Sequence, residues 1–163
     1  MHAVPALIAL AIATVFILPA VRWPVLGRWL VALMFLGGAA LNAFYTLPNA
    51  PGSLEALVAT SFVPFYRDVI ELAVSVNGAA FAALVVAFEL AVGASILSRS
   101  RLSQLGLLAA AAWSIGMLPV IPPDGILIGI ALTGAPGVAA LILLRERAAS
   151  TSKRRFAAAG QPA

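Results

Sequence analysis

The sequence predicts an all-α integral membrane protein with five membrane-spanning helices. Apolar residues make up 63% of the 163 residues and charged residues only 10%, whereas soluble domains average roughly 45–50% and about 25%. A soluble chain of this length leaves a large share of its surface in contact with water, so it could not hide this much apolar surface. The charged residues also lie mainly between long apolar runs, which is typical of helices that cross a lipid bilayer.

Five apolar runs approach the length of about 20 residues that a membrane-spanning helix needs. They cover residues 4–21, 29–47, 72–97, 102–120 and 125–144. The first run is the shortest, but it lacks the basic segment and the small-residue cleavage site of a signal peptide, so we expect an uncleaved helix. We therefore predict one transmembrane domain over residues 1–147 and a basic, flexible cytoplasmic tail over residues 148–163.

The distribution of charge predicts the orientation. If all five runs cross the membrane, nine basic residues share one side: Arg22, Arg28, Arg99, Arg101, Arg145, Arg147, Lys153, Arg154 and Arg155. The other side holds Arg67 with the acidic residues Glu55, Asp68, Glu71 and Asp124. Arginine and lysine are enriched in cytoplasmic loops, which places the N-terminus outside and the C-terminus in the cytoplasm. Abundant alanine and a single lysine are typical of GC-rich bacterial coding, so we expect a bacterial cytoplasmic (inner) membrane.

Composition also excludes several chemistries. The chain has no cysteine, and His2 is its only histidine, so thiolate chemistry, iron–sulfur ligation and buried haem ligation are not expected. No nucleotide-binding loop, hydrolase motif or zinc-ligand spacing occurs. We therefore predict no metal site, no catalytic residue and no covalently bound cofactor, and no basic, aromatic face for nucleic acid.

One connection, residues 48–70, is much longer than the others. Pro48, Pro51 and Gly52 end the second span, and Ser53 is a candidate N-cap. Apolar residues then recur at roughly helical spacing from Leu54 onward, which predicts a short amphipathic helix in the outer interface. This helix either caps the bundle or forms a lid or a docking surface.

A carboxylate inside the third span is the strongest candidate for a functional residue. Glu89 lies at a depth where an unpaired charge costs on the order of 2–4 kcal/mol. Arg28 begins the second span from the cytoplasmic side, and its long side chain predicts an Arg28–Glu89 ion pair. Asn42 and Tyr45 lie further out on the second span and could hydrogen-bond across the bundle. Two interpretations remain open: Glu89 links helices structurally, or it binds a quinone, a lipid or protons.

Small residues recur at positions that favour close helix packing. In the third span, Gly78 and Gly93 share a face with Glu89. In the fifth span a small residue recurs every fourth position, and Asp124 is a candidate N-cap; the recurring residues are Gly125, Gly129, Thr133 and Gly137. Gly106, Ala110 and Ser114 repeat this spacing in the fourth span, so either these two spans pack together or one face contacts a second copy or another subunit.

Several of these segments resemble the DoxX-like family of small membrane proteins. The resemblance covers about residues 28–144 and consists of Arg28 with the Phe-Leu-Gly-Gly segment 35–38, the Glu-x-x-x-Gly segment from Glu89 ahead of a basic turn, and Pro119 at the end of the next span. The resemblance implies a four-helix transmembrane bundle, to which this chain adds an N-terminal helix. Family members are associated with membrane redox systems, including thiosulfate:quinone oxidoreductase subunits and oxidative-stress assemblies.

These observations support three functional hypotheses. The first is a non-catalytic accessory or scaffolding subunit of a larger membrane complex, such as a respiratory or other redox assembly. The second is a lipid- or quinone-binding protein or enzyme that uses a cavity around Glu89, and the third is a small transporter. The expected partners are membrane lipids and either other membrane subunits or further copies of this chain.

Overall fold

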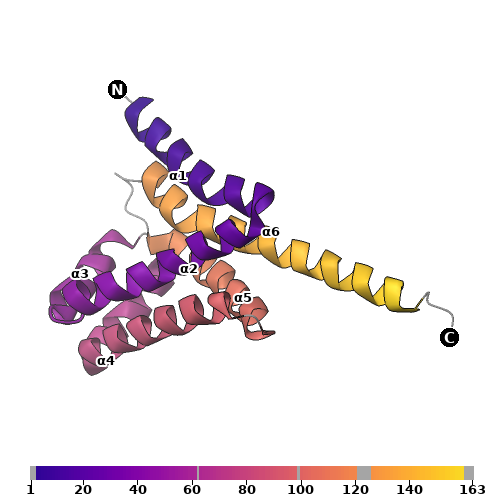
Figure 1. Cartoon of the computed structure of the whole chain (residues 1–163). Coiled ribbons are helices and arrows are strands. Elements are labelled where there is room, and N and C mark those ends of the chain that lie inside the picture. The colour runs from indigo at the N-terminus through magenta and orange to yellow at the C-terminus, as the bar shows by residue number, and fades with distance from the viewer. Residues whose placement is uncertain (1–2, 62, 99, 121–125, 160–163) are drawn as a thin grey trace.

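The computed structural model describes residues 3–61, 63–98, 100–120 and 126–159, of which Ala3 and residues 151–159 are described by their backbone alone. The described chain is helical throughout (Figure 1). Its elements are α1 (Ala3–Arg22), α2 (Pro24–Leu41), the π-helical turn η1 (Asn42–Thr46), α3 (Ala50–Thr60), α4 (Pro64–Leu97), α5 (Leu102–Met117), the short 3₁₀ turn η2 (Leu118–Val120) and α6 (Ile126–Ala159).

Five of these helical segments are long and apolar enough to cross a membrane, which confirms the predicted number of candidate spans. Proline begins both α2 and α4, where its missing N–H is not needed for helix hydrogen bonding. The predicted amphipathic helix is α3, but it begins at Ala50, so Ser53, the candidate N-cap, lies inside the helix.

The long helix α4 consists of two parts that meet at Asn77. Asn77 has φ −168° and ψ 90°, and its side-chain Oδ1 accepts a hydrogen bond from the backbone N–H of Ala80 at 3.0 Å. This is N-cap geometry, so Asn77 starts a new helix within α4. The part after Asn77 is about 30 Å long, which matches the hydrocarbon core of a bilayer. The third span was predicted to begin at residue 72, five residues before this cap.

The helices pack through small residues. A Cβ atom built on Gly93 would lie 2.7 Å from Leu36 Cγ, so α2 and α4 approach closely at this glycine. A Cβ on Gly137 would lie 2.7 Å from Ser114 Cβ, so α5 and α6 pack closely at this glycine, as the first of the two alternatives expects. Gly78 faces Leu54 of α3, with a built Cβ 3.3 Å from Leu54 Cδ1.

The remaining members of the fifth-span pattern behave differently. Thr133 donates a hydrogen bond from Oγ1 to the carbonyl of Gly129 at 2.8 Å. Gly125 and the predicted N-cap Asp124 lie outside the described residues. In the fourth span Gly106 packs against α4 and not α6, because a Cβ there would lie 2.8 Å from the backbone nitrogen of Ile96.

The N-terminal helix lies at the periphery of the bundle. In Figure 1, α1 runs beside α6, and the packing of α1 is chiefly on α6 and secondarily on α2. Only 11% of the most apolar stretch of α1 is buried within the chain, compared with 28–39% for the corresponding stretches of the other four spans.

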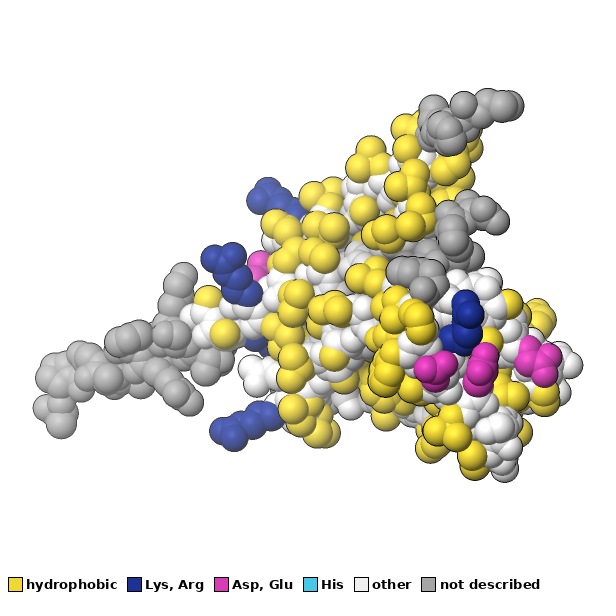
Figure 2. Space-filling model, turned by 180° about the vertical axis from the view of Figure 1, so that it is seen from behind, with side chains coloured by type: hydrophobic (Ala, Val, Ile, Leu, Met, Phe, Trp, Pro, Cys, Tyr) yellow, Lys and Arg dark blue, Asp and Glu magenta, His cyan; other side chains and the backbone are white. Residues whose placement is uncertain are grey.

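The charged side chains separate toward two ends of the bundle. Arg22 ends α1, Arg28 lies in the first turns of α2, Arg101 precedes α5, and Arg145 and Arg147 lie in the second half of α6. The acidic residues Glu55, Asp68 and Glu71, together with Arg67, lie on α3 and on the first part of α4. In Figure 2 most basic side chains lie toward the far end of α6 and most acidic ones at the opposite end. Glu146, between Arg145 and Arg147 on α6, is an acidic residue at the basic end.

The segment predicted to be a flexible tail begins as a helix. α6 continues without interruption through residue 148 to Ala159. Alanine, arginine and lysine, which dominate this segment, are among the residues with the highest helix propensity, and this gives a physical reason for the continuation.

Candidate functional site: a cavity around Glu89

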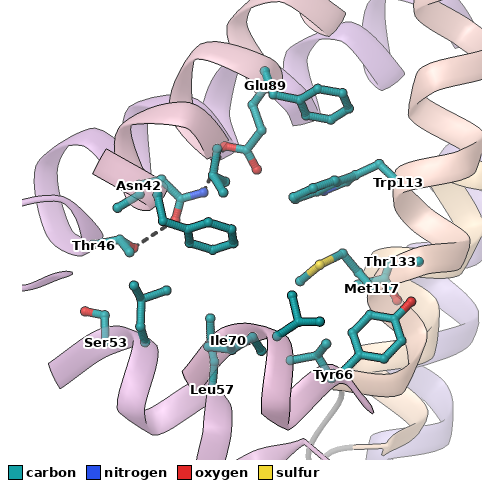
Figure 3. A pocket seen from close by; sticks show the side chains of 18 of the residues that line it. Asn42, Thr46, Ser53, Leu57, Tyr66, Ile70, Glu89, Trp113, Met117 and Thr133 are labelled. Carbon is teal, nitrogen blue, oxygen red and sulfur yellow. Dashed lines mark hydrogen bonds between the residues drawn. The ribbon is translucent and has the colours of Figure 1, made fainter. Parts of the chain in front are cut away.

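A cavity of about 840 Å³ lies within the bundle, in the half away from the basic end. Its walls come from the second half of α2, η1, the middle of α4 and the second half of α5, and α3 and the first part of α4 close it from the acidic side. The lining is mostly apolar; Leu57, Ile70, Phe81, Val85, Phe88 and Met117 contribute to it. The polar side chains Glu89, Asn42, Thr46, Ser53, Tyr66 and Thr133 also reach it (Figure 3).

Glu89, Asn42 and Thr46 form a hydrogen-bonded row at one end of this cavity. Asn42 donates from Nδ2 to Glu89 Oε2 at 2.8 Å, and Thr46 donates from Oγ1 to Asn42 Oδ1 at 2.8 Å. The two bonds together fix the orientation of the Asn42 amide. Glu89 is 8% exposed, and in Figure 3 its carboxylate points into the space between Asn42 and Trp113.

The backbone on both sides of this row is adapted to it. η1 is a single π-helical turn in which the N–H of Leu47 bonds to the carbonyl of Asn42 at 2.7 Å, and such turns occur frequently at functional sites. Across from Glu89, a Cβ on Gly38 would lie 3.2 Å from Glu89 Oε1. Glycine at position 38 thus leaves room for the carboxylate against α2.

The predicted Arg28–Glu89 ion pair is not formed between these two described residues. Arg28 instead donates from Nη2 to the carbonyls of Ile96 at 2.7 Å and Ser98 at 2.9 Å. The last carbonyls of a helix have no partner within it, and those of α4 lie beside the start of α2. Glu89 lies about 10 Å deeper along α4 than Ile96, so the helix terminus takes the guanidinium.

Tyr45 also differs from its predicted role. It is 70% exposed and does not line the cavity, whereas Asn42 does. Tyr66 is the tyrosine that lines the cavity. The first part of α4 carries Tyr66 to the cavity, and no local sequence pattern indicates this contact.

An aromatic wall faces the carboxylate from α4 and α5. The rings of Phe88 and Trp113 are tilted at 39° with their centroids 4.9 Å apart. The sequence contained a signal for Trp113 that was missed. Tryptophan in membrane proteins concentrates at the interfaces, as Trp23 and Trp29 do at the ends of helices here, whereas Trp113 lies well inside a span.

Fold and site together define a class: a polytopic helical chain that encloses a largely apolar cavity with one carboxylate in its wall. Within the described residues, no group of three or more histidine, aspartate or glutamate side chains is arranged to hold a metal ion. No protein-family model, curated protein or solved structure matches the chain. The resemblance of residues 28–144 to the DoxX-like family stays a prediction from the quoted segments.

Proposed function

We propose that the chain is a membrane-embedded binding protein for an amphiphile with a long apolar chain, such as a lipid or a quinone. The observation that carries this proposal is the cavity itself, which combines an apolar lining with one hydrogen-bonded polar end. Its volume falls within the range of about 300–1,000 Å³ that is typical of small-molecule sites. A few polar groups in an apolar site fix the orientation of a ligand, and Glu89 and Asn42 are placed to bind a head group.

Two features argue against a purely structural role for Glu89. A carboxylate that only links helices is expected to have its hydrogen-bonding capacity met by protein groups, because an unsatisfied buried charge is costly. Among the described residues, the hydrogen bond that Glu89 receives comes from the side chain of Asn42. The carboxylate also lies in the wall of a cavity large enough for a ligand, so the remaining interactions are available to a bound molecule.

We place the chain in a bacterial cytoplasmic membrane with its C-terminus in the cytoplasm. The support for this orientation is the separation of basic and acidic side chains toward opposite ends of the bundle, which follows the enrichment of arginine and lysine in cytoplasmic segments. In this orientation α3 and the first part of α4 lie on the outer side. The cavity then lies in the outer half of the membrane.

Tryptophan fluorescence tests the proposed binding directly. With Trp23 and Trp29 replaced by Phe, Trp113 is the remaining fluorophore, and a brominated long-chain alcohol quenches it on contact. Gly116→Leu extends a side chain into the cavity, since a Cβ at Gly116 meets only Tyr66 Oη at 3.9 Å. Gly37→Leu is the matched control, because a Cβ there has no neighbour within 4 Å and Gly37 does not line the cavity.

We expect saturable quenching in the parent protein, little change in Gly37→Leu, and a loss of about tenfold or more in apparent affinity in Gly116→Leu. Quenching that is equal in the two leucine variants would contradict the proposal, because it would show that the alcohol reaches Trp113 from the surrounding lipid and not through the cavity.

A second candidate is the accessory subunit of a larger membrane complex, which the exposed position of α1 favours. α1 contributes little to the interior of this chain, and its outward face is apolar, with Leu7 and Leu10 about two-thirds exposed. Copurification of a stoichiometric partner from the native membrane, lost on Leu10→Arg, would support this role. Recovery of a lone monomer in mild detergent would contradict it.

A further inference from the structure

The described lining of the cavity carries one acidic side chain and no basic one, which indicates the class of ligand. Among the described residues that line it, Glu89 is the only carboxylic acid, and none is arginine, lysine or histidine. The guanidinium nearest along α2, that of Arg28, is bound at the far end of α4. No cationic side chain therefore neutralises Glu89 from within the cavity wall.

The hydroxyls of Thr46 and Thr133 do not compensate for this. Thr46 uses its hydroxyl hydrogen on Asn42, and Thr133 uses its own on the carbonyl of Gly129. One N–H of Asn42 is already given to Glu89. The Glu89 carboxylate thus keeps acceptor positions that a ligand with hydrogen-bond donors would fill. The donors in the lining are the second N–H of Asn42, the Ser53 and Tyr66 hydroxyls and the Trp113 indole N–H.

The aromatic wall also favours a positively charged ligand. Trp113 lies across from the Glu89 carboxylate in Figure 3, with Phe88 packed against it. The face of an indole ring attracts cations, and the attraction is stronger where water is excluded. A carboxylate and an indole ring that line the same space together favour a positively charged group there.

From these features we propose that the cavity binds a cationic amphiphile, a primary or substituted alkylamine whose ammonium group lies between Glu89 and Trp113 and whose alkyl chain follows the apolar lining. This inference rests on the proposed function and narrows it, since a quinone has a neutral, hydrogen-bond-accepting head. The ammonium donates to the carboxylate, and the chain extends toward Leu57 and Ile70, where α3 and the first part of α4 close the cavity.

Three probes with the same alkyl chain and different head groups test this proposal: dodecylamine, dodecanol and dodecanoate. Binding is measured by displacement of the brominated alcohol from the Trp113-only protein, in bilayers of zwitterionic lipid that do not themselves concentrate cations. Glu89→Gln removes the charge and keeps the shape, and Glu71→Gln is the matched control, because Glu71 is exposed and does not line the cavity.

We expect dodecylamine to bind about tenfold or more tightly than dodecanol and dodecanoate to bind weakest, as an ionic contact at a largely buried carboxylate predicts. Glu89→Gln should abolish the preference for the amine and retain binding of the alcohol, and Glu71→Gln should change neither. Equal affinities for amine and alcohol in the parent protein would overturn the proposal even if Glu89→Gln fails to fold. That result would leave the proposed binding of amphiphiles intact. Absence of saturable binding by all three probes would contradict both the proposed binding and its preference for a cationic ligand.

Discussion

Two buried serines on α5 provide a direct test of the packing described above. Ser103 and Ser114 are 0% and 2% exposed, and both lie on the same helix in tight contact with a neighbour. Ser103 donates from Oγ to the carbonyl of Ile96 at 3.0 Å. Ser114 Oγ is buried and has no hydrogen-bond partner. The same substitution, serine to alanine, should therefore have opposite effects at the two positions.

The expected sizes follow from these contacts. Ser103→Ala loses one hydrogen bond, worth about 0.5–1.5 kcal/mol in general and about 0.6 kcal/mol on average between membrane helices. The Ile96 carbonyl keeps the bond from Arg28, so no acceptor is left without a partner, and we expect a loss of about 0.5–1 kcal/mol. Ser114→Ala removes an unpaired buried hydroxyl and retains the Cβ that packs near Gly137, so we expect a gain of about 0.5–1 kcal/mol.

The assay is reversible unfolding in mixed micelles, followed by far-ultraviolet circular dichroism. The two variants should differ by about 1–2 kcal/mol, which corresponds to roughly tenfold in the unfolding equilibrium constant. Ser75→Ala is the control, because Ser75 is exposed on α4 and bonds only to Leu72 of its own helix. Equal destabilisation by Ser103→Ala and Ser114→Ala would refute the reasoning, since it would mean that Ser114 has a partner in the folded protein.

Three further predictions concern helix contacts and can be measured in the same unfolding assay. Gly106→Ala should destabilise the protein by about 1–2 kcal/mol, because its Cβ would lie 2.8 Å from Ile96 N and overpacking outweighs the gain in helix propensity. Gly37→Ala, whose Cβ meets nothing within 4 Å, should stabilise the protein by about 0.5–1 kcal/mol. If both substitutions changed the stability in the same direction, this prediction would be contradicted. Arg28→Ala should cost about 1–3 kcal/mol of stability through the loss of two charged hydrogen bonds at the end of α4, and Arg28→Lys should recover part of it. Unchanged stability of Arg28→Ala would show that these two bonds do not stabilise the fold. Asn77→Ala should cost about 1 kcal/mol as a lost N-cap and should broaden the spin-label distance between the start of α4 and α5, measured with two introduced cysteines in this cysteine-free chain.

The number of candidate spans could be predicted because length and apolarity alone determine it. The inner structure of the long connection could not. Pro64 starts a helix within this connection and Asn77 starts another just after it, but proline and asparagine also occur in turns, and no local pattern distinguishes the two uses. The apolar run from residue 72 continues through the bend, so hydropathy gives no sign of where the membrane-spanning part begins.

The candidate site was predicted only in part, because some of its contacts are non-local. Glu89 and Asn42 follow from rules about polar residues at membrane depth, and they do meet. The partner of Arg28 depended on which acceptor lay nearer, a backbone carbonyl or a carboxylate, and sequence patterns for side chains do not count backbone acceptors. Tyr66 and Trp113 reach the cavity through tertiary folding and the bend in α4, which are non-local.

The pairing of α1 with α6 has a consequence for how this protein is made. A ribosome delivers α1 to the membrane first and α6 last, yet each is a principal neighbour of the other. During synthesis α1 must therefore wait in lipid, or beside the insertion machinery, while more than 100 residues follow it. A chain truncated before α6 would insert four spans and still leave the first without its main contact.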